Sequence, residues 1–93
     1  MEYRVCFSFF IVSGTEEAVV LKDRLLDRLG KIKCVDEYDA YDDGENWCVD
    51  CIATIESDSF ETVGTEMEKV FGTDYIWDYH YIKNVENGVY WEP

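Results

Sequence analysis

The chain has 93 residues, of which 47% are hydrophobic and 16% aromatic, and this composition excludes a disordered chain. Its 21 acids against 8 Lys and Arg give a net charge of −13, which excludes direct binding to nucleic acid or to an anionic membrane. We therefore expect one domain, residues 1–93, whose surface attracts basic proteins or cations.

The charge is unevenly distributed along the chain. Residues 1–33 hold five acids and six bases, a net charge of +1, whereas residues 34–93 hold sixteen acids and two bases, a net charge of −14. Solubility alone requires much less charge than this. From composition, a role of these acids in binding and a role in solubility both stay open.

The N-terminal third predicts a strand followed by a helix. Residues 3–12 alternate with apolar side chains on both faces, which is typical of a central strand. Ser13 or Thr15 then caps a helix whose leucines recur at helical spacing. Gly30 is placed to end this helix in the left-handed conformation.

An acidic hairpin is expected over residues 34–56. Asp43-Gly44 is a two-residue turn signal between two runs of period-two alternation. This turn places Asp36 on the core face opposite a cysteine and Glu37 on the other face, directly opposite Asp50. Two carboxylates facing each other across strands destabilise the sheet unless something outside the chain compensates.

The remaining chain predicts a second helix and a fourth strand. Several N-caps at residues 57–59 start the helix, and Gly72 ends it. Residues 74–83 alternate aromatic and mixed side chains, a strand pattern that does not reveal which row faces the core. Asn87-Gly88 is a second turn signal, after which residues 89–91 can return as a short edge strand.

The element order β-α-β-β-α-β predicts an α+β fold, a ferredoxin-like sandwich. We expect a four-stranded antiparallel sheet in the order 4-1-3-2, with both helices on one face. The uncovered face is apolar enough to need a partner. A homodimer through this face and a C-terminal hairpin folded over it are the two alternatives.

The sequence contains no pattern of an active site, a cofactor site or a metal site. Cys48 and Cys51 are three residues apart within a strand and so point to opposite faces, and with Cys6 and Cys34 they indicate reduced thiols in a cytoplasmic protein. His80 has no nucleophile at motif spacing. No phosphate loop or calcium loop occurs, and no run approaches the ~20 apolar residues of a membrane span.

The acids of the hairpin admit two interpretations. They can protect an exposed edge strand from aggregation, for which two or three charges suffice. Alternatively they form an anionic ridge whose carboxylates imitate the phosphates of a nucleic acid, with tyrosine adding contact area. The candidate partner-binding residues are Asp36, Glu37, Asp39, Tyr41, Asp42, Asp43, Glu45 and Asp50.

In size, charge and element order the whole chain resembles small acidic inhibitors encoded by phages and mobile elements, among them anti-CRISPR proteins and other DNA mimics. No motif is shared, so no residue role is transferred. The resemblance implies a non-enzymatic inhibitor in the host cytoplasm that binds a basic nucleic-acid-binding protein or nucleoprotein complex. An immunity protein against a basic nuclease toxin and a small ligand-binding regulatory domain are the alternatives. The mimicry hypothesis depends on the Glu37–Asp50 pair and on the absence of compensating cations in the chain itself.

Overall fold

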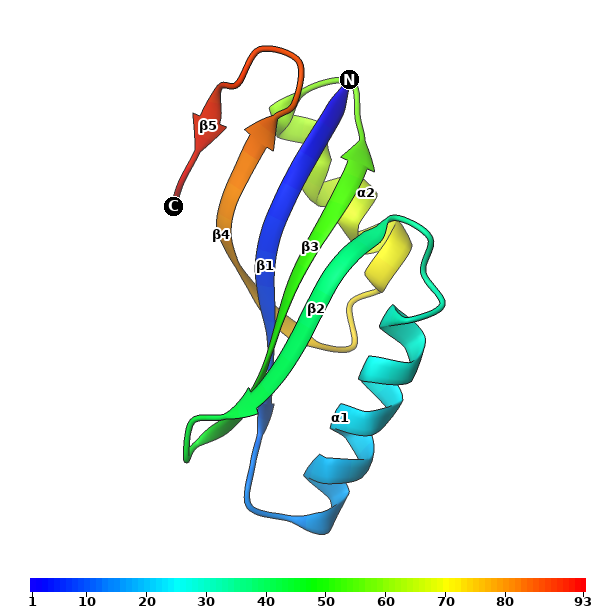
Figure 1. Ribbon diagram of the computed structural model, residues 1–93, viewed down its shortest axis with the longest axis vertical. Coiled ribbons are helices and arrows are strands. Elements are labelled where there is room, and N and C mark those ends of the chain that lie inside the picture. The colour runs from blue at the N-terminus through cyan, green and yellow to red at the C-terminus, as the bar shows by residue number, and fades with distance from the viewer.

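The computed structural model describes residues 1–93 as an α+β fold (Figure 1). Its elements are β1 (Glu2–Val12), α1 (Glu16–Leu29), β2 (Val35–Asp42), β3 (Asn46–Glu56), α2 (Phe60–Phe71), β4 (Ile76–Asn84) and β5 (Tyr90–Trp91). The strands form one antiparallel sheet in the order β2-β3-β1-β4-β5. The α+β class with two helices is confirmed, but the sheet differs from the expected four-stranded order 4-1-3-2 because β5 adds a fifth strand beside β4.

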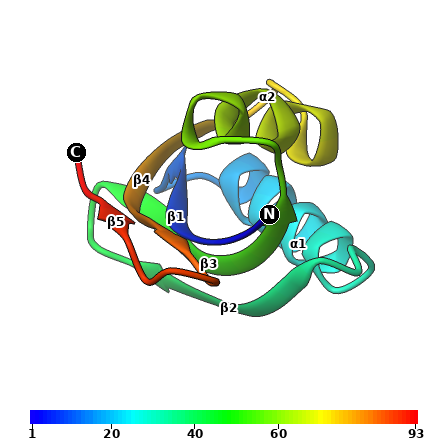
Figure 2. The same cartoon turned by 90° about the horizontal axis from the view of Figure 1, so that it is seen from above.

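The sheet has one covered face and one open face. Both helices lie on the same side of the sheet, as Figure 2 shows. The core-facing side chains of β1, all buried, are Tyr3, Val5, Phe7, Phe9 and Ile11. The helices add Ala18, Leu25, Leu29, Val63, Met67 and Phe71 to this core. The opposite face carries no helix, and we call it the open face.

A bulge in β4 decides which of its side chains face the core. Cys6 of β1 pairs with Tyr81, but the next residue, Phe7, pairs with Tyr79, so His80 is an extra residue in the ladder. Before the bulge the odd-numbered side chains of β4 pack on the core, and after it the even-numbered Ile82 does so. A period-two pattern could not resolve the orientation of this strand because its phase changes within it.

Helix α1 has Thr15, one of the two predicted residues, as its N-cap, but its C-terminal end differs from the prediction. The Ala18 N–H donates to Thr15 Oγ1 at 3.1 Å. The prediction that Gly30 is left-handed is wrong, because its φ is −63°. A Cβ at this position would lie 3.0 Å from the hydroxyl oxygen of Tyr38, so the glycine permits close approach of a β2 side chain.

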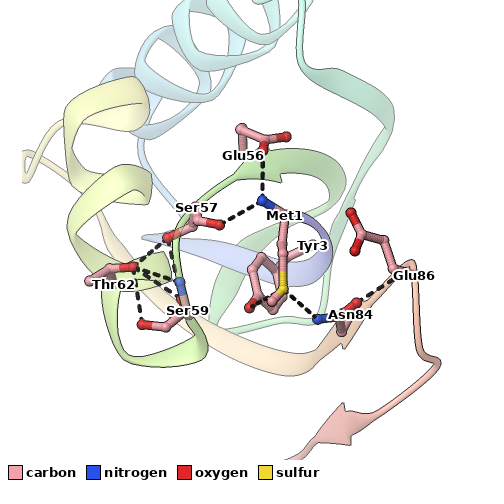
Figure 3. Close-up of polar contacts among 8 residues, drawn as sticks. All are labelled: Met1, Tyr3, Glu56, Ser57, Ser59, Thr62, Asn84 and Glu86. Atoms are coloured by element: carbon pink, nitrogen blue, oxygen red, sulfur yellow. Dashed lines mark hydrogen bonds and ion pairs between the residues drawn. The ribbon is translucent and has the colours of Figure 1, made fainter.

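A polar network ties the start of the chain to the start of α2 (Figure 3). The Met1 ammonium donates to Glu56 Oε1 at 2.7 Å and to the Ser57 carbonyl at 3.0 Å. The Ser59 N–H donates to Thr62 Oγ1 at 3.2 Å and so satisfies a free amide at the helix N-terminus. Helix α2 ends at Gly72, as predicted, with φ +77°.

The C-terminal turn also formed where the sequence predicted it. Asn84 Oδ1 accepts hydrogen bonds from the Glu86 and Asn87 N–H groups at 2.9 and 3.2 Å, and Gly88 has φ +75°. The returning strand β5 pairs edge to edge with β4, so the alternative in which this hairpin covers the open face is wrong. Neither helix has the length and apolar character that crossing a bilayer requires.

Candidate partner-binding surface

The turn of the β2–β3 hairpin lies one residue later than predicted. The Asp43 N–H donates to the Asn46 carbonyl at 3.0 Å, which makes Gly44 and Glu45 the two central residues. Gly44 has φ +99°, a conformation that tight hairpin turns use at their first central position and that glycine adopts without strain. The dipeptide Asp43-Gly44 therefore marks the turn correctly but does not occupy its centre.

This one-residue displacement moves the cross-strand partners of residues 37–42 by two residues. Glu37 lies opposite Ile52, so the predicted Glu37–Asp50 pair is wrong. Asp39 instead lies directly opposite Asp50. Because a shift of two preserves the facing of side chains, Glu37 and Asp39 stay on the open face. A like-charge cross-strand pair is therefore present in the hairpin, at a position one step nearer the turn.

A second irregularity corrects the placement of Asp36. Val35 pairs with Ala53 and Glu37 pairs with Ile52, so Asp36 is an extra residue in β2. Its carboxylate accepts a hydrogen bond from Thr54 Oγ1 at 2.7 Å, on the open face rather than on the core face. Val35, predicted to face outward, packs against the core.

Two acids at the turn accept hydrogen bonds from backbone N–H groups of the hairpin itself. Asp43 Oδ1 accepts from the Glu45 and Asn46 N–H groups at 2.9 and 2.7 Å, and Asp42 Oδ1 accepts from the Gly44 N–H at 2.8 Å. The hydrogen bonds from Asn46 and Glu45 lower the pKa of Asp43 below its ordinary value. Asp42 and Asp43 therefore shape the turn in addition to carrying charge.

None of the seven candidate partner-binding acids forms an ion pair within the chain. The three ion pairs of the protein are Met1 ammonium–Glu56, Lys22–Asp23 and Lys69–Glu66. The open face carries two cations, Arg4 and Lys83, and they lie opposite each other across β1 and β4. The carboxylates of Asp39 and Asp50 have no cation of this chain within 4.0 Å.

Ser8 joins the acidic pair to the only histidine. Ser8 is 2% exposed, and its Oγ donates to Asp50 Oδ1 at 2.5 Å. His80 Nε2 lies 2.6 Å from Ser8 Oγ. Because Ser8 donates its single proton to Asp50, a hydrogen bond between Ser8 and His80 requires a proton on His80 Nε2, with Ser8 Oγ as the acceptor. Asp78 also lies opposite Ser8, from β4.

Sequence reasoning missed the roles of Ser8, His80 and Asp78 in this surface. Their proximity to Asp50 depends on the pairing of β1 with both neighbours and on the bulge in β4, and no local motif encodes either. Alternation alone could have placed Ser8 and Asp50 on the same face. A row of polar side chains thus crosses the four strands from Asp39 to Asp78.

A shallow hollow of about 220 Å³ lies beside this row. Its walls include Glu37, Asp39, Asp50 and His80, with Cys6 and Ile52 between them. Toward the hairpin tip the open face becomes apolar, where Val12 and Ile76 are 76% and 74% exposed and Tyr41 is 47% exposed. Anionic and apolar contact areas therefore adjoin on the open face. Both helices lie on the other side of the sheet (Figure 2).

The four cysteines are all free thiols, and they differ in burial. Cys51 faces the core, and burial raises its pKa to about 12, with the nearby Cys34 and Cys6 adding to the increase. Cys48 lies on the open face but is buried, and its thiol donates to Asp43 Oδ2 at 3.5 Å. Cys6, Cys48 and Cys51 lie on strands of the sheet, and Cys34 lies in the turn before β2.

Alkaline pH is expected to destabilise the protein through Cys51. The pKa of this thiol is higher in the folded chain, about 12, than the ordinary value of 9.0, so its contribution to stability is complete below pH 9.0 and is lost as the pH rises toward 12. Denaturant unfolding at several pH values should show the free energy of unfolding falling above pH 9.0. The Cys51→Ala variant should show a shallower decrease, and identical slopes in both proteins would contradict the assignment.

The structure divides the predicted site residues into two groups. The open face carries Asp36, Glu37, Asp39, Tyr41 and Asp50, whereas Asp42, Asp43 and Glu45 form the turn and its flank. Comparison with family models, with curated proteins and with solved structures finds no match to this chain.

Proposed function

We propose that the protein is a non-enzymatic inhibitor whose acidic open face occupies the nucleic-acid-binding surface of a basic partner. The observation that supports this function is that none of the seven candidate partner-binding acids has an ion-pair partner within the chain. The Glu37–Asp50 pair that the sequence predicted is absent, so the proposal depends instead on Asp39 and Asp50, which face each other with no cation of this chain within 4.0 Å. A cationic partner would relieve their repulsion. A nucleoprotein complex and a basic nuclease toxin fit the same surface, because both present clustered Lys and Arg.

The geometry of β2 suits this role. Glu37 and Asp39 alternate with inward residues, so their Cα atoms are about 6.6 Å apart, a spacing near that of successive phosphates along a nucleic-acid strand. Lys and Arg clusters that bind phosphates release counterions on contact, and a row of carboxylates draws on the same free energy. The exposed ring of Tyr41 adds contact area beside this row.

The order of the helices and strands favours a more specific assignment of the fold. We place the chain in the ferredoxin-like architecture, with β5 as an addition at the β4 edge. In that arrangement β2 is an edge strand, and the row of polar side chains from Asp39 to Asp78 runs from this edge across the sheet. A homodimer through the open face is disfavoured by this assignment, because a second copy would bring another row of carboxylates against the first.

Affinity purification with matched charge variants tests the proposed function. We expect the wild-type protein to capture a basic nucleic-acid-binding protein from a host lysate and duplex DNA to compete for it. Glu37→Gln, Asp39→Asn and Asp50→Asn combined should weaken this complex at least tenfold, which corresponds to 1.4 kcal/mol. The affinity should also fall steeply as the salt concentration rises.

The control removes the same number of charges elsewhere. Glu17→Gln, Asp27→Asn and Glu92→Gln combined alter exposed acids outside the open face and should leave the affinity within about twofold, since distant exposed charges are screened. An affinity that is insensitive to salt, or a loss of equal size in both triple variants, would reject the proposal.

A further inference from the structure

A second hollow lies on the covered side of the sheet, between α2 and the β4–β5 edge. Its volume is about 350 Å³, and its walls are Phe60, Glu61, Gly64, Tyr79, Ile82 and Trp91. Strand β5 is the edge opposite to β2 in the sheet, so this hollow is remote from the acidic hairpin (Figure 1). None of its wall residues belongs to the candidate partner-binding residues.

The β4–β5 pairing and the bulge in β4 orient the aromatic walls. The pairing of Trp91 with the buried Ile82 turns the indole toward the helix side. The bulge at His80 lets Tyr79 and Ile82, three residues apart, both face this side. The rings of Tyr79 and Trp91 lie 6.1 Å apart between centroids at an angle of 82°, and they form two perpendicular walls.

The helix contributes an open floor. Gly64 lies inside α2, where glycine costs up to about 1 kcal/mol relative to alanine. A Cβ added there would meet only the Tyr79 hydroxyl, at 3.7 Å, which is an ordinary contact. Close packing therefore does not require a glycine here, and the missing side chain leaves space beside the two rings.

The charge of the hollow is negative. Glu61 lies in the first turn of α2, forms no ion pair, and is the only charged residue of the walls. Hydrogen bonds from its own N–H and from the Ser59 side chain lower the pKa of Glu61, which keeps it ionised near neutral pH. The faces of tryptophan and tyrosine are themselves electron-rich and attract cations.

We propose that this hollow binds a methylated ammonium group, with Tyr79 and Trp91 as the cation–π walls and Glu61 as the counter-charge. A methylated ammonium group has an apolar surface and a positive charge, and the walls offer a partner for each. An anion would be repelled by Glu61, and a neutral apolar group would have no charge to attract the Glu61 carboxylate. The same head group occurs in free choline-like molecules and on methylated lysine side chains.

Titration of the full 93-residue chain with choline and with an acetylated trimethyllysine amide tests the proposal. Amide and indole NMR signals should shift in a saturable way at Gly64 and Trp91 with at least one of the two ligands. The tighter ligand identifies the source of the head group. The neutral isostere of choline, 3,3-dimethyl-1-butanol, should bind at least tenfold more weakly.

Variants on the same elements provide matched controls. Trp91→Ala and Glu61→Gln should each weaken binding at least fivefold, because they remove a wall and the counter-charge. Tyr90→Ala changes the neighbouring β5 residue, which pairs with Lys83 on the open face, and should leave binding unchanged. Glu16→Gln changes a first-turn acid of α1 and should also have no effect.

Three results would overturn the proposal. Equal affinity for choline and its neutral isostere would show an unselective apolar groove. Shifts confined to the hairpin acids would show general attraction of cations by the charge of −13. No saturable shift with either ligand, in a wild-type chain with a native spectrum, would show that the hollow does not bind this group.

Discussion

The Phe7→Ala variant is expected to lose about 3–5 kcal/mol of unfolding free energy, the usual range for deleting a buried aromatic ring. Phe7 is fully buried at the centre of β1, and its ring lies 5.1 Å from the rings of both Phe9 and Phe71 and 6.0 Å from that of Trp77. The alanine would leave a cavity between the sheet and α2 that close-packed neighbours fill only in part. Denaturant unfolding monitored by circular dichroism measures the loss.

A conservative variant separates cavity formation from other causes. Phe7→Leu retains most of the apolar volume and should lose clearly less than Phe7→Ala. Since small domains are stable by only about 5–15 kcal/mol, the alanine variant can approach complete unfolding at moderate temperature. A loss below about 1 kcal/mol for Phe7→Ala would contradict the placement of this ring in the core.

The second large effect is expected at Ser8. Ser8→Ala removes the hydroxyl that donates to Asp50 at 2.5 Å and accepts from His80, and Asp50 then keeps its charge beside Asp39 without this donor. Hydrogen bonds to charged groups contribute about 1.5–3 kcal/mol, and we expect a loss in this range at neutral pH. In a double-mutant cycle the penalty of Ser8→Ala should shrink when Asp50 is changed to alanine.

An exposed serine–aspartate pair in the same protein supplies the control. Ser13 donates to Asp42 Oδ1 at 3.1 Å in an exposed position, so Ser13→Ala should cost less than about 0.5 kcal/mol. Equal losses at Ser8 and Ser13 would show that burial of the Ser8–Asp50 contact is unimportant. In the wild type, ¹⁵N chemical shifts of His80 should report a proton on Nε2.

The helices and strands were predictable because each has a local signal. Thr15 caps α1, Gly72 ends α2, and alternation in β3 correctly separates the buried row from the outward row. These features depend on neighbours in sequence and on the side-chain period of each element. The acidic character of the hairpin was visible for the same reason.

The register of the sheet was not predictable from local signals. Gly44 suits either central position of a tight turn, and the choice between them decides whether Glu37 or Asp39 faces Asp50. The extra residues Asp36 and His80 break the alternation within their strands. Sequence patterns therefore identified the acidic face but not the pairs of carboxylates on it.

The bulge in β4 also bears on how this strand tolerates changes in length. Since Cys6 pairs with Tyr81 and Phe7 with Tyr79, the hydrogen-bonded ladder on either side of His80 would be continuous without that residue. A chain shortened by this one position keeps every other partner of β1, so strand pairing does not explain why the histidine is there. What this residue adds to the sheet is its imidazole, whose Nε2 lies 2.6 Å from the Ser8 hydroxyl oxygen.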